Sequence, residues 1–503
     1  MSTERIPTGF DNPIIDEKGY LDEVLTAGEE FPEVACFDLT VSSIQNPCLQ
    51  KKIGRYRNEL NRKSVTANME VINKCIEEKK TVPSFLEAGP RKILFHNPKN
   101  LKVAIVTTGG LAPGLNCVVH SIVKRHCATY EITKSKQFGV YGINESFKGA
   151  CDLHAHLVVL TPSRTEAWLE KGGSGLGMRR HFPDGNDSLT VKQQKLTAEI
   201  AAQIIAAKIN ILYVIGGDGS LSTAHQIALK VFNKNISVIG IPKTMDNDVF
   251  WVSESFGFKT AVENTTHIIN TLNSEAESTR RICLIEIFGA ESGFVAAHSA
   301  LASGHVDLVL VPEEFQNLTK TQCEGVLTTH IEYLKEKVGN LPTEEEKPHA
   351  VVVIAEGVAK ILKEKKARLG GKQIGTKTNP DFLIQLKDYL NNTDKGYSNI
   401  TDRDGNKLDV FFNRPRHYIR ATPANSHDQV YCDQLGAMAV DSALAGFTDC
   451  MISLWHNNYV LVPLELVADK HRRISPDGVF WKQVVNNTNQ PTFESNREAG
   501  AEI

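Results

Sequence analysis

The sequence lacks a strong net charge of either sign. Its 56 lysine and arginine residues and 59 aspartate and glutamate residues leave a formal net charge of −3 over 503 residues. Nucleic acids and anionic membranes attract proteins through an excess of basic residues, so the overall charge gives no reason to expect either partner. An anionic ligand would have to be bound by local basic groups.

The sequence also lacks the cysteine patterns of zinc or disulfide proteins. Its ten cysteines are scattered, with no C-x-x-C pair and no Cys/His cluster at zinc spacing, so we interpret them as reduced thiols in a cytosolic compartment. The first 20 residues contain no apolar segment typical of a signal peptide, and no stretch approaches the roughly 18 apolar residues of a membrane helix. We therefore expect a cytoplasmic protein.

The length of 503 residues exceeds one ordinary hydrophobic core, so we expect two or more domains. Residues 1–95 are polar and low in glycine, which predicts an N-terminal extension that packs on a neighbour, with a helix at 69–80. Two charged, glycine-containing stretches at 363–380 and 391–407 predict long surface loops. The first could also bind a phosphate.

From residue 101 onward, short apolar runs alternate with helical segments. The predicted strands are VAIVTT, ILYVIG, SVIGIP, ICLIEIFG, LVLVP, AVVVIAEG and CMISLW. Residues 197–210 are typical of a helix, with Ile200 and Ile204 four apart and Ile205 beside them. Apolar strands joined through helices indicate a parallel sheet covered on both faces. The predicted fold class is α/β.

Two of these strands end in glycine-rich turns followed by helices. The first turn, GGLAPG, contains Gly109, Gly110 and Gly114. Glycine lets backbone N–H groups close on a phosphate at a helix N-terminus, although the spacing matches neither the Rossmann nor the Walker pattern. The second turn, GGDGS, contains Gly217, Asp218 and Gly219. A carboxylate there would repel a phosphate unless a divalent cation such as Mg²⁺ lay between them.

A third strand ends in the acidic segment KTMDND, which includes Asp246 and Asp248. Asp and Asn favour turns, so an ordinary turn is one interpretation. Acids at neighbouring strand ends also repel each other unless a cation or a protonation change compensates them. Asp218 and Asp248 could hold a metal ion and leave Asp246 to accept a proton. These parts suffice for phosphoryl transfer when basic groups hold the phosphates.

A further glycine stretch, EKGGSGLGMRRHFPD, is either a flexible loop or a source of positive charge through Arg179 and Arg180. Taken in order, the segments TTGGLAPGLN, GGSGLG, GGDGS, PKTMDND, FGFKTAVE, SGFVAAHSALASG, VPEE and AEG resemble 6-phosphofructokinase from about residue 100 to about 470. YIRATPANSHD and WHNNYVLVP are similar to the long ATP-dependent enzymes of plants and trypanosomatids, a branch related to the pyrophosphate-dependent enzymes.

The resemblance implies two doubly wound, Rossmann-like phosphofructokinase lobes behind an N-terminal extension. We place the extension at 1–95, a nucleotide-binding lobe at 96–240, a sugar-phosphate lobe at 241–465 whose segments interleave with the first, and a C-terminal tail at 466–503. It implies transfer of the γ-phosphoryl group of ATP to the 1-hydroxyl of fructose 6-phosphate with Mg²⁺. It also implies a homo-oligomer, either a dimer or a tetramer, because in relatives the residue matching Arg281 reaches a neighbouring subunit.

The resemblance assigns site residues one by one. Asp246 matches the general base, with Thr244 and Lys243 beside it, and Asp218 and Asp248 match the metal site. The implied nucleotide-binding residues are Gly109, Gly110, Arg180, Gly217, Asp218, Gly219 and Ser220. The implied substrate-binding residues are Thr244, Asp246, Arg281, Gly289, Glu356, Tyr418 and Arg420.

Two positions carry information about specificity. Glycine at 219 is similar to the ATP users of the family, whereas pyrophosphate users have aspartate there. The family arginine after M-G is absent, since the chain reads FGAES with Ala290 in that place. The alternatives are therefore a related sugar-phosphate kinase, a pyrophosphate-dependent variant, or a weakly active regulatory homologue. A dinucleotide dehydrogenase fits the α/β pattern but lacks the glycine fingerprint.

Overall fold

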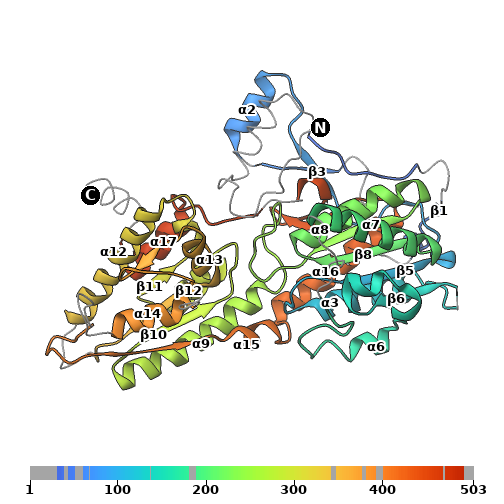
Figure 1. Cartoon of the computed structure of the whole chain (residues 1–503). Helices are drawn as coiled ribbons and strands as arrows, with labels where there is room; N and C mark the ends of the chain where they lie inside the picture. The colour runs from blue at the N-terminus through green and yellow to red at the C-terminus, as the bar shows by residue number, and fades with distance from the viewer. Residues whose placement is uncertain are drawn as a thin grey trace.

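The computed structural model describes residues 31–38, 44–50, 61–66, 68–135, 137–179, 189–340, 347–376, 381–391, 400–467 and 471–491. They form two lobes, each built on its own sheet (Figure 1). We refer to the lobe with the nine-stranded sheet as the large lobe and to that with the four-stranded sheet as the small lobe. The α/β prediction is confirmed.

The large sheet has the strand order β2-β3-β17-β16-β9-β8-β5-β6-β7. Its strands are β2 (Arg62–Ser64), β3 (Ser84–Glu87), β17 (Asn458–Pro463), β16 (Cys450–Trp455), β9 (Ser237–Pro242), β8 (Ile211–Gly216), β5 (Lys102–Thr107), β6 (Gly139–Ile143) and β7 (Leu157–Val159). The five strands from β16 to β6 are parallel, and antiparallel strands flank them. Both faces of this sheet are apolar, as expected for parallel strands.

Helices cover both faces of the large sheet (Figure 1). One face packs against α7 (Leu189–Ala206) and α8 (Asp218–Val231), through residues that include Ile200, Ile204 and Leu221. The opposite face packs against α3 (Leu115–Lys124) and α16 (Ser426–Leu444). Ile205 is 37% exposed, so it lies outside the apolar stripe that the sequence predicted.

The small sheet has the order β11-β12-β10-β15, and its paired strands are all parallel. These strands are β11 (Leu308–Leu310), β12 (Ala350–Ala355), β10 (Arg281–Ile287) and β15 (Asp409–Asn413). On one face lie α9 (Phe258–Thr279), α10 (Phe294–Ser303) and α17 (Val479–Thr488). On the other lie α12 (Lys320–Gly339), α13 (Glu356–Glu364) and α14 (Phe382–Asn391).

The remaining elements are short. They are β1 (Ile44–Gln45), β4 (Ile93–Leu94), β13 (Arg368–Leu369), β14 (Lys372–Gln373), α2 (Met69–Glu77), α4 (Ser146–Ala150), α5 (Leu153–His156), α6 (Pro162–Glu166), α11 (Pro312–Phe315), α15 (Arg416–Arg420), the 3₁₀ helices η1 (Pro47–Gln50), η2 (Pro98–Asn100), η4 (Phe232–Lys234) and η5 (Leu464–Leu466), and the π-helical turn η3 (Arg125–Thr129). In the described part of the chain, no helix is both long and apolar enough to cross a membrane.

The chain crosses between the lobes more than once. After β9 it enters the small lobe through α9, and it returns through α15 and α16 to add β16 and β17 to the large sheet. Strand β3 of the N-terminal region pairs with β17, and Phe85 of β3 is buried in the large-lobe core. The described part of the predicted extension therefore packs on the same chain.

One predicted loop contains regular structure. Part of the stretch 363–380 belongs to the end of α13 and to the hairpin β13–β14, so the prediction of a continuous loop was wrong there. Gly370 and Gly371 form the turn with φ of 56° and 75°. Two successive positive φ values are the requirement of a tight hairpin turn, and the Gly-Gly pair was the available signal.

Candidate functional site

The candidate site lies where the carboxyl ends of β5, β8 and β9 face the end of β10. Ligands of open α/β sheets bind at such strand ends. The side chain of Ser292, which follows β10 in the small lobe, donates a hydrogen bond of 3.0 Å to the backbone oxygen of Asp246, which follows β9 in the large lobe. The two lobes therefore meet at the acidic segment that the sequence singled out.

The glycine turns after β5 and β8 leave a space beside Lys243. Gly109 has φ of 85°, and a Cβ there would lie 3.1 Å from Lys243 Nζ. The backbone N–H of Lys243 also donates to the oxygen of Gly216. A larger residue at 109 would be strained and would press on the lysine, so the structure explains the glycine at this turn.

Gly110 and Gly219 differ from the tightly packed glycines, because a Cβ at either position would meet no atom within 4 Å. Gly219 lies in the first turn of α8, next to Ser220, whose hydroxyl donates to Thr108 Oγ1 over 3.5 Å. Gly217 is the N-cap of α8. Open space beside a helix N-terminus is the arrangement that accommodates phosphate oxygens.

The acidic segment after β9 combines a turn with paired carboxylates. Thr244 Oγ1 donates to Asp248 Oδ1 over 2.7 Å, and the N–H of Asp246 donates to Thr244 Oγ1 over 3.1 Å. Asn247 has a left-handed φ of 56°, and its side-chain oxygen accepts the N–H of Ser255 over 2.9 Å. The turn interpretation is therefore correct for Asn247.

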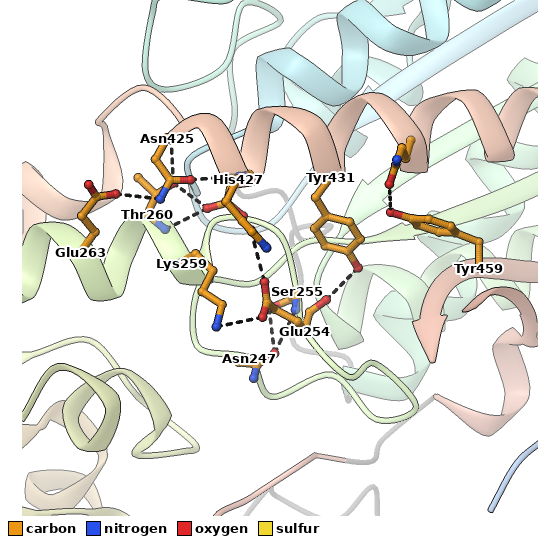
Figure 2. Close-up of polar contacts among 12 residues, drawn as sticks. Asn247, Glu254, Ser255, Lys259, Thr260, Glu263, Asn425, His427, Tyr431 and Tyr459 are labelled. Carbon is orange, nitrogen blue, oxygen red and sulfur yellow. Dashed lines mark hydrogen bonds and ion pairs between the residues drawn. The ribbon is translucent and has the colours of Figure 1, made fainter. Parts of the chain in front are cut away.

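The loop after this turn is held by a network of polar contacts (Figure 2). Glu254 contacts Lys259 over 3.1 Å and His427 over 3.5 Å, and its backbone oxygen accepts the hydroxyl of Tyr431. Asp428 accepts hydrogen bonds from the backbone and the hydroxyl of Thr260. These contacts attach the loop to the N-terminal turns of α9 and α16, so residues far apart in the chain position the acidic segment.

Burial and mutual repulsion dominate the electrostatics of the site. Burial, followed by the nearby charge of Asp248, raises the pKa of Asp246 to about 7. Burial, followed by the charge of Asp218, raises the pKa of Asp248. Burial lowers the pKa of Lys243 to about 8, although Asp246, Asp248 and Asp218 oppose this shift. Perturbed groups of this kind gather where protons and charged ligands are handled.

Asp218 and Asp248 are the two carboxylates that the sequence predicts to hold a divalent cation. Asp218 is the first residue of α8, and its charge acts on Asp248. No group of three or more His, Cys, Asp or Glu residues that could hold a metal occurs in the described ranges. Two carboxylates nevertheless suit Mg²⁺, which takes its remaining ligands from phosphate and water.

The segment His471–Ile474 also contacts the site, and the sequence analysis missed it. His471 Nε2 lies 3.4 Å from Asp218 Oδ2. The backbone N–H of Arg472 donates to the backbone oxygen of Asp248 over 2.7 Å. His471 forms a backbone bridge with Val249. The predicted tail at 466–503 therefore includes residues in contact with both acids that the sequence predicts to bind a metal, and the basic triplet HRR was the available sequence signal for it.

The small lobe contributes the turn after β10 and the start of α13. Gly289 has φ of 131°, and its oxygen accepts the N–H of Gly357, next to Glu356. Arg420 lies over the ring of Phe288 at 4.3 Å and is close enough to lower the pKa of Asp246. The charge of Glu356 has the opposite effect. Glu356 and Arg420 therefore lie near Asp246, and Gly289 contacts the residue after Glu356.

The structure does not bring three further predicted site residues into contact with Asp246 within the described part of the chain. Arg281 begins β10, at the strand end opposite Gly289, and lines a pocket of about 250 Å³ with Lys387 and Asp409. The side chain of Tyr418 is 83% exposed. Arg180 lies outside the described residues, whereas its neighbour Arg179 donates to Glu145 over 3.2 Å. Within one chain, the structure does not bring Arg281 to Asp246.

Comparison with known proteins gives one consistent family. The profile described as Phosphofructokinase matches residues 102–443. A Borreliella burgdorferi protein named ATP-dependent 6-phosphofructokinase is 32% identical over 414 residues, covering 82% of this chain and 86% of the relative. The chloroplastic ATP-dependent 6-phosphofructokinase 5 of Arabidopsis thaliana is 32% identical, covering 81% of this chain and 69% of the relative.

A Trypanosoma cruzi protein, also named ATP-dependent 6-phosphofructokinase, is 29% identical, with coverage of 79% and 75%. Among solved structures, the pyrophosphate-dependent phosphofructokinase of Marinobacter aquaeolei superposes with a TM-score of 0.56 at 17% identity, covering 78% of this chain and 92% of that one. At this identity the structural likeness supports the fold alone. The sequence matches agree with the plant and trypanosomatid resemblance.

Proposed function

The chain belongs to the phosphofructokinase family, and we propose that it transfers the γ-phosphoryl group of ATP to the 1-hydroxyl group of fructose 6-phosphate. The observation that carries this proposal is the meeting of Asp218, Asp246 and Asp248 at the ends of two adjacent parallel strands. Enzymes of this family are kinases that generally use Mg²⁺ and ATP.

Asp246 is the proposed general base. It would accept the proton of the sugar 1-hydroxyl, and a pKa near 7 suits a base that works at neutral pH. Thr244 orders the turn by accepting the backbone N–H of Asp246 and donating to the carboxylate of Asp248, so Thr244 binds only the Asp248 carboxylate of the two. Lys243 supplies a buried positive charge between the glycine turns and these acids.

ATP is the proposed phosphoryl donor. The open space beside Gly110 and Gly219 supports a nucleotide phosphate there, since neither position carries a Cβ that would fill it. Gly109, Gly217 and Ser220 would surround the phosphates from the same turns. Asp218 and Asp248 would hold Mg²⁺, which when bound would neutralise charge on the transferred phosphoryl group.

Gly289, Glu356 and Arg420 are the proposed contacts of the sugar phosphate. Arg281 begins β10, at the strand end opposite Gly289, and Tyr418 lies in α15 beside Arg420 but is largely exposed. We propose that they serve the site of another subunit, which makes the active form a homo-oligomer, either a dimer or a tetramer. The ten cysteines remain thiols, which is typical of a reducing compartment such as the proposed cytoplasm.

A coupled assay on purified protein tests the proposal. Fructose 6-phosphate and other ketose phosphates would each be offered with ATP, ADP and pyrophosphate. We expect turnover with fructose 6-phosphate and ATP. Preference for another ketose phosphate would favour the alternative that Ala290 suggests, a related sugar-phosphate kinase, and no turnover with any pair would contradict kinase activity.

A further inference from the structure

The segment His471–Ile474 bridges the two lobes across the candidate site. His471 contacts the large lobe through Asp218 and Val249. Two residues later, Arg473 lies 4.0 Å from Glu291 in the small lobe, and the N–H of Ile474 donates to a carboxylate oxygen of Glu313 over 3.0 Å. The segment therefore fixes the acidic loops of both lobes relative to one another.

Arg473 is the buried charge of this segment. Its side chain is 3% exposed, and the acids that act on it are Glu291, Glu313 and Asp248. Burial lowers the pKa of Arg473, while these three carboxylates favour its charged form. A buried guanidinium needs such compensation from nearby carboxylates.

The acids beside Arg473 support the loop 289–293. Glu313 accepts the N–H of Gly293 through both carboxylate oxygens, at 3.0 and 3.1 Å. Glu291, within the loop, is also bound by Lys360 at 2.7 Å. Ser292 of the same loop donates a hydrogen bond from its hydroxyl to the backbone oxygen of Asp246. Arg473 contacts Glu291, and the next residue, Ser292, contacts the turn that carries the proposed base.

We propose that Arg473 is a positioning residue for phosphoryl transfer, which holds Glu291, and through it the loop 289–293, against the Asp246 turn. This inference rests on the proposed function. The loop also accepts the N–H of Gly357, next to Glu356, through the oxygen of Gly289. Glu291 and Glu313 act on Arg473 more strongly than Asp248 does, so Arg473 acts chiefly on the sugar side of the site, whereas the glycine turns on the nucleotide side belong to the large lobe.

Variants at 473 and 291 test this role. Arg473→Gln should raise KM for fructose 6-phosphate about tenfold or more, the size expected for a lost charged contact, and should leave KM for ATP within about twofold. Arg473→Lys should recover part of this loss because it keeps the charge. In a Glu291→Gln background, Arg473→Gln should change KM for the sugar phosphate much less, since its partner is already neutral.

Arg125→Gln is the matched control. Arg125 forms a two-bond ion pair with the buried Asp441, away from the site, at 2.9 and 2.7 Å. This variant should lower the unfolding midpoint and leave both KM values unchanged. If Arg473→Gln behaves like Arg125→Gln, or if its effect persists fully in the Glu291→Gln background, the positioning role is wrong.

Two readouts that require no turnover separate this proposal from the proposed function. Calorimetric titration with fructose 6-phosphate measures the loss of sugar binding directly. The unfolding midpoints of the parent, both single variants and the double variant measure the coupling of Arg473 to Glu291 without any ligand. A parent that phosphorylates no ketose phosphate contradicts the proposed function, whereas additive midpoints for the two substitutions contradict the contact itself.

Discussion

The hydroxyl of Ser292 donates to the backbone oxygen of Asp246 over 3.0 Å, so a residue of the small lobe touches the turn that ends a strand of the large lobe. The contact places the proposed base at the junction of the lobes. A change in how the lobes approach each other would therefore move Asp246 relative to the residues proposed to bind the sugar phosphate. Substitutions on either side of this junction should alter catalysis in distinguishable ways.

Asp246→Asn removes the proposed base and keeps its shape. General-base catalysis contributes typically 10²–10⁴-fold, so kcat should fall by at least about 10²-fold. The affinity for ATP should change little, because the nucleotide side depends on the glycine turns. Steady-state kinetics and nucleotide titration measure both quantities. Near-normal kcat would assign the base to another residue.

Gly219→Asp places a carboxylate in the open space beside α8. The carboxylate should repel the nucleotide α-phosphate that is expected beside residue 219 and that pyrophosphate lacks. ATP use should therefore fall much more than pyrophosphate use, as measured by kcat/KM for each donor. Gly219→Ala is the matched control, since it adds a methyl group without charge where no atom lies within 4 Å, and it should affect ATP use far less. An unchanged KM for ATP in the aspartate variant would show that residue 219 does not face the donor.

Ala290→Arg restores the side chain that the family resemblance leads one to expect. A charged contact to phosphate contributes about 1.5–3 kcal/mol, so kcat/KM for fructose 6-phosphate should rise about tenfold or more. A fall in activity on the true substrate would instead indicate a site reshaped for another sugar. If the variant matches the parent on every ketose phosphate, position 290 does not face the substrate.

Glu314→Gln should reduce the loss of stability at high pH. Glu314 and His330 are each 1% exposed and lie 3.3 Å apart, and burial raises the pKa of Glu314 to about 8 and lowers that of His330 to about 4. The folded state therefore keeps a proton on Glu314 that the unfolded chain releases near its ordinary pKa of 4.5. Its stabilising contribution is complete below that pH and is lost as pH rises toward 8.

The pH dependence of stability that His330 contributes has the opposite sign, because its lowered pKa makes stability rise with pH between about 4 and 6.5. Between pH 6.5 and 8 Glu314 contributes more than His330 to this dependence, and it lowers the free energy of unfolding by about 1.4 kcal/mol per pH unit. The unfolding midpoint of the parent should fall across this window more than that of Glu314→Gln. Glu332→Gln, an exposed change on the same helix as His330, should follow the parent. Parallel curves for parent and Glu314→Gln would contradict the assignment.

Local patterns predicted much of the fold and of the candidate site. The runs ILYVIG, SVIGIP and CMISLW coincide with β8, β9 and β16, because a buried parallel strand is a continuous apolar segment. Among the strands of five or more residues, β6, β15 and β17 were missed. β6 contains two glycines and β15 is only partly buried, so neither presents a simple apolar run. The roles of the individual site residues stay predictions that the experiments above test.

The sequence by itself determined which residues end strands and which turns require glycine, since both depend on a few adjacent residues. It therefore placed Gly109, Asp218 and Asp246 at strand ends. Only the tertiary structure decided which strand ends adjoin and which distant side chains meet them. His471 reaches Asp218, and Arg473 reaches Glu291, across 253 and 182 residues of chain. Such contacts arise from the packing of two lobes through interleaved crossings, a long-range outcome that no local pattern encodes.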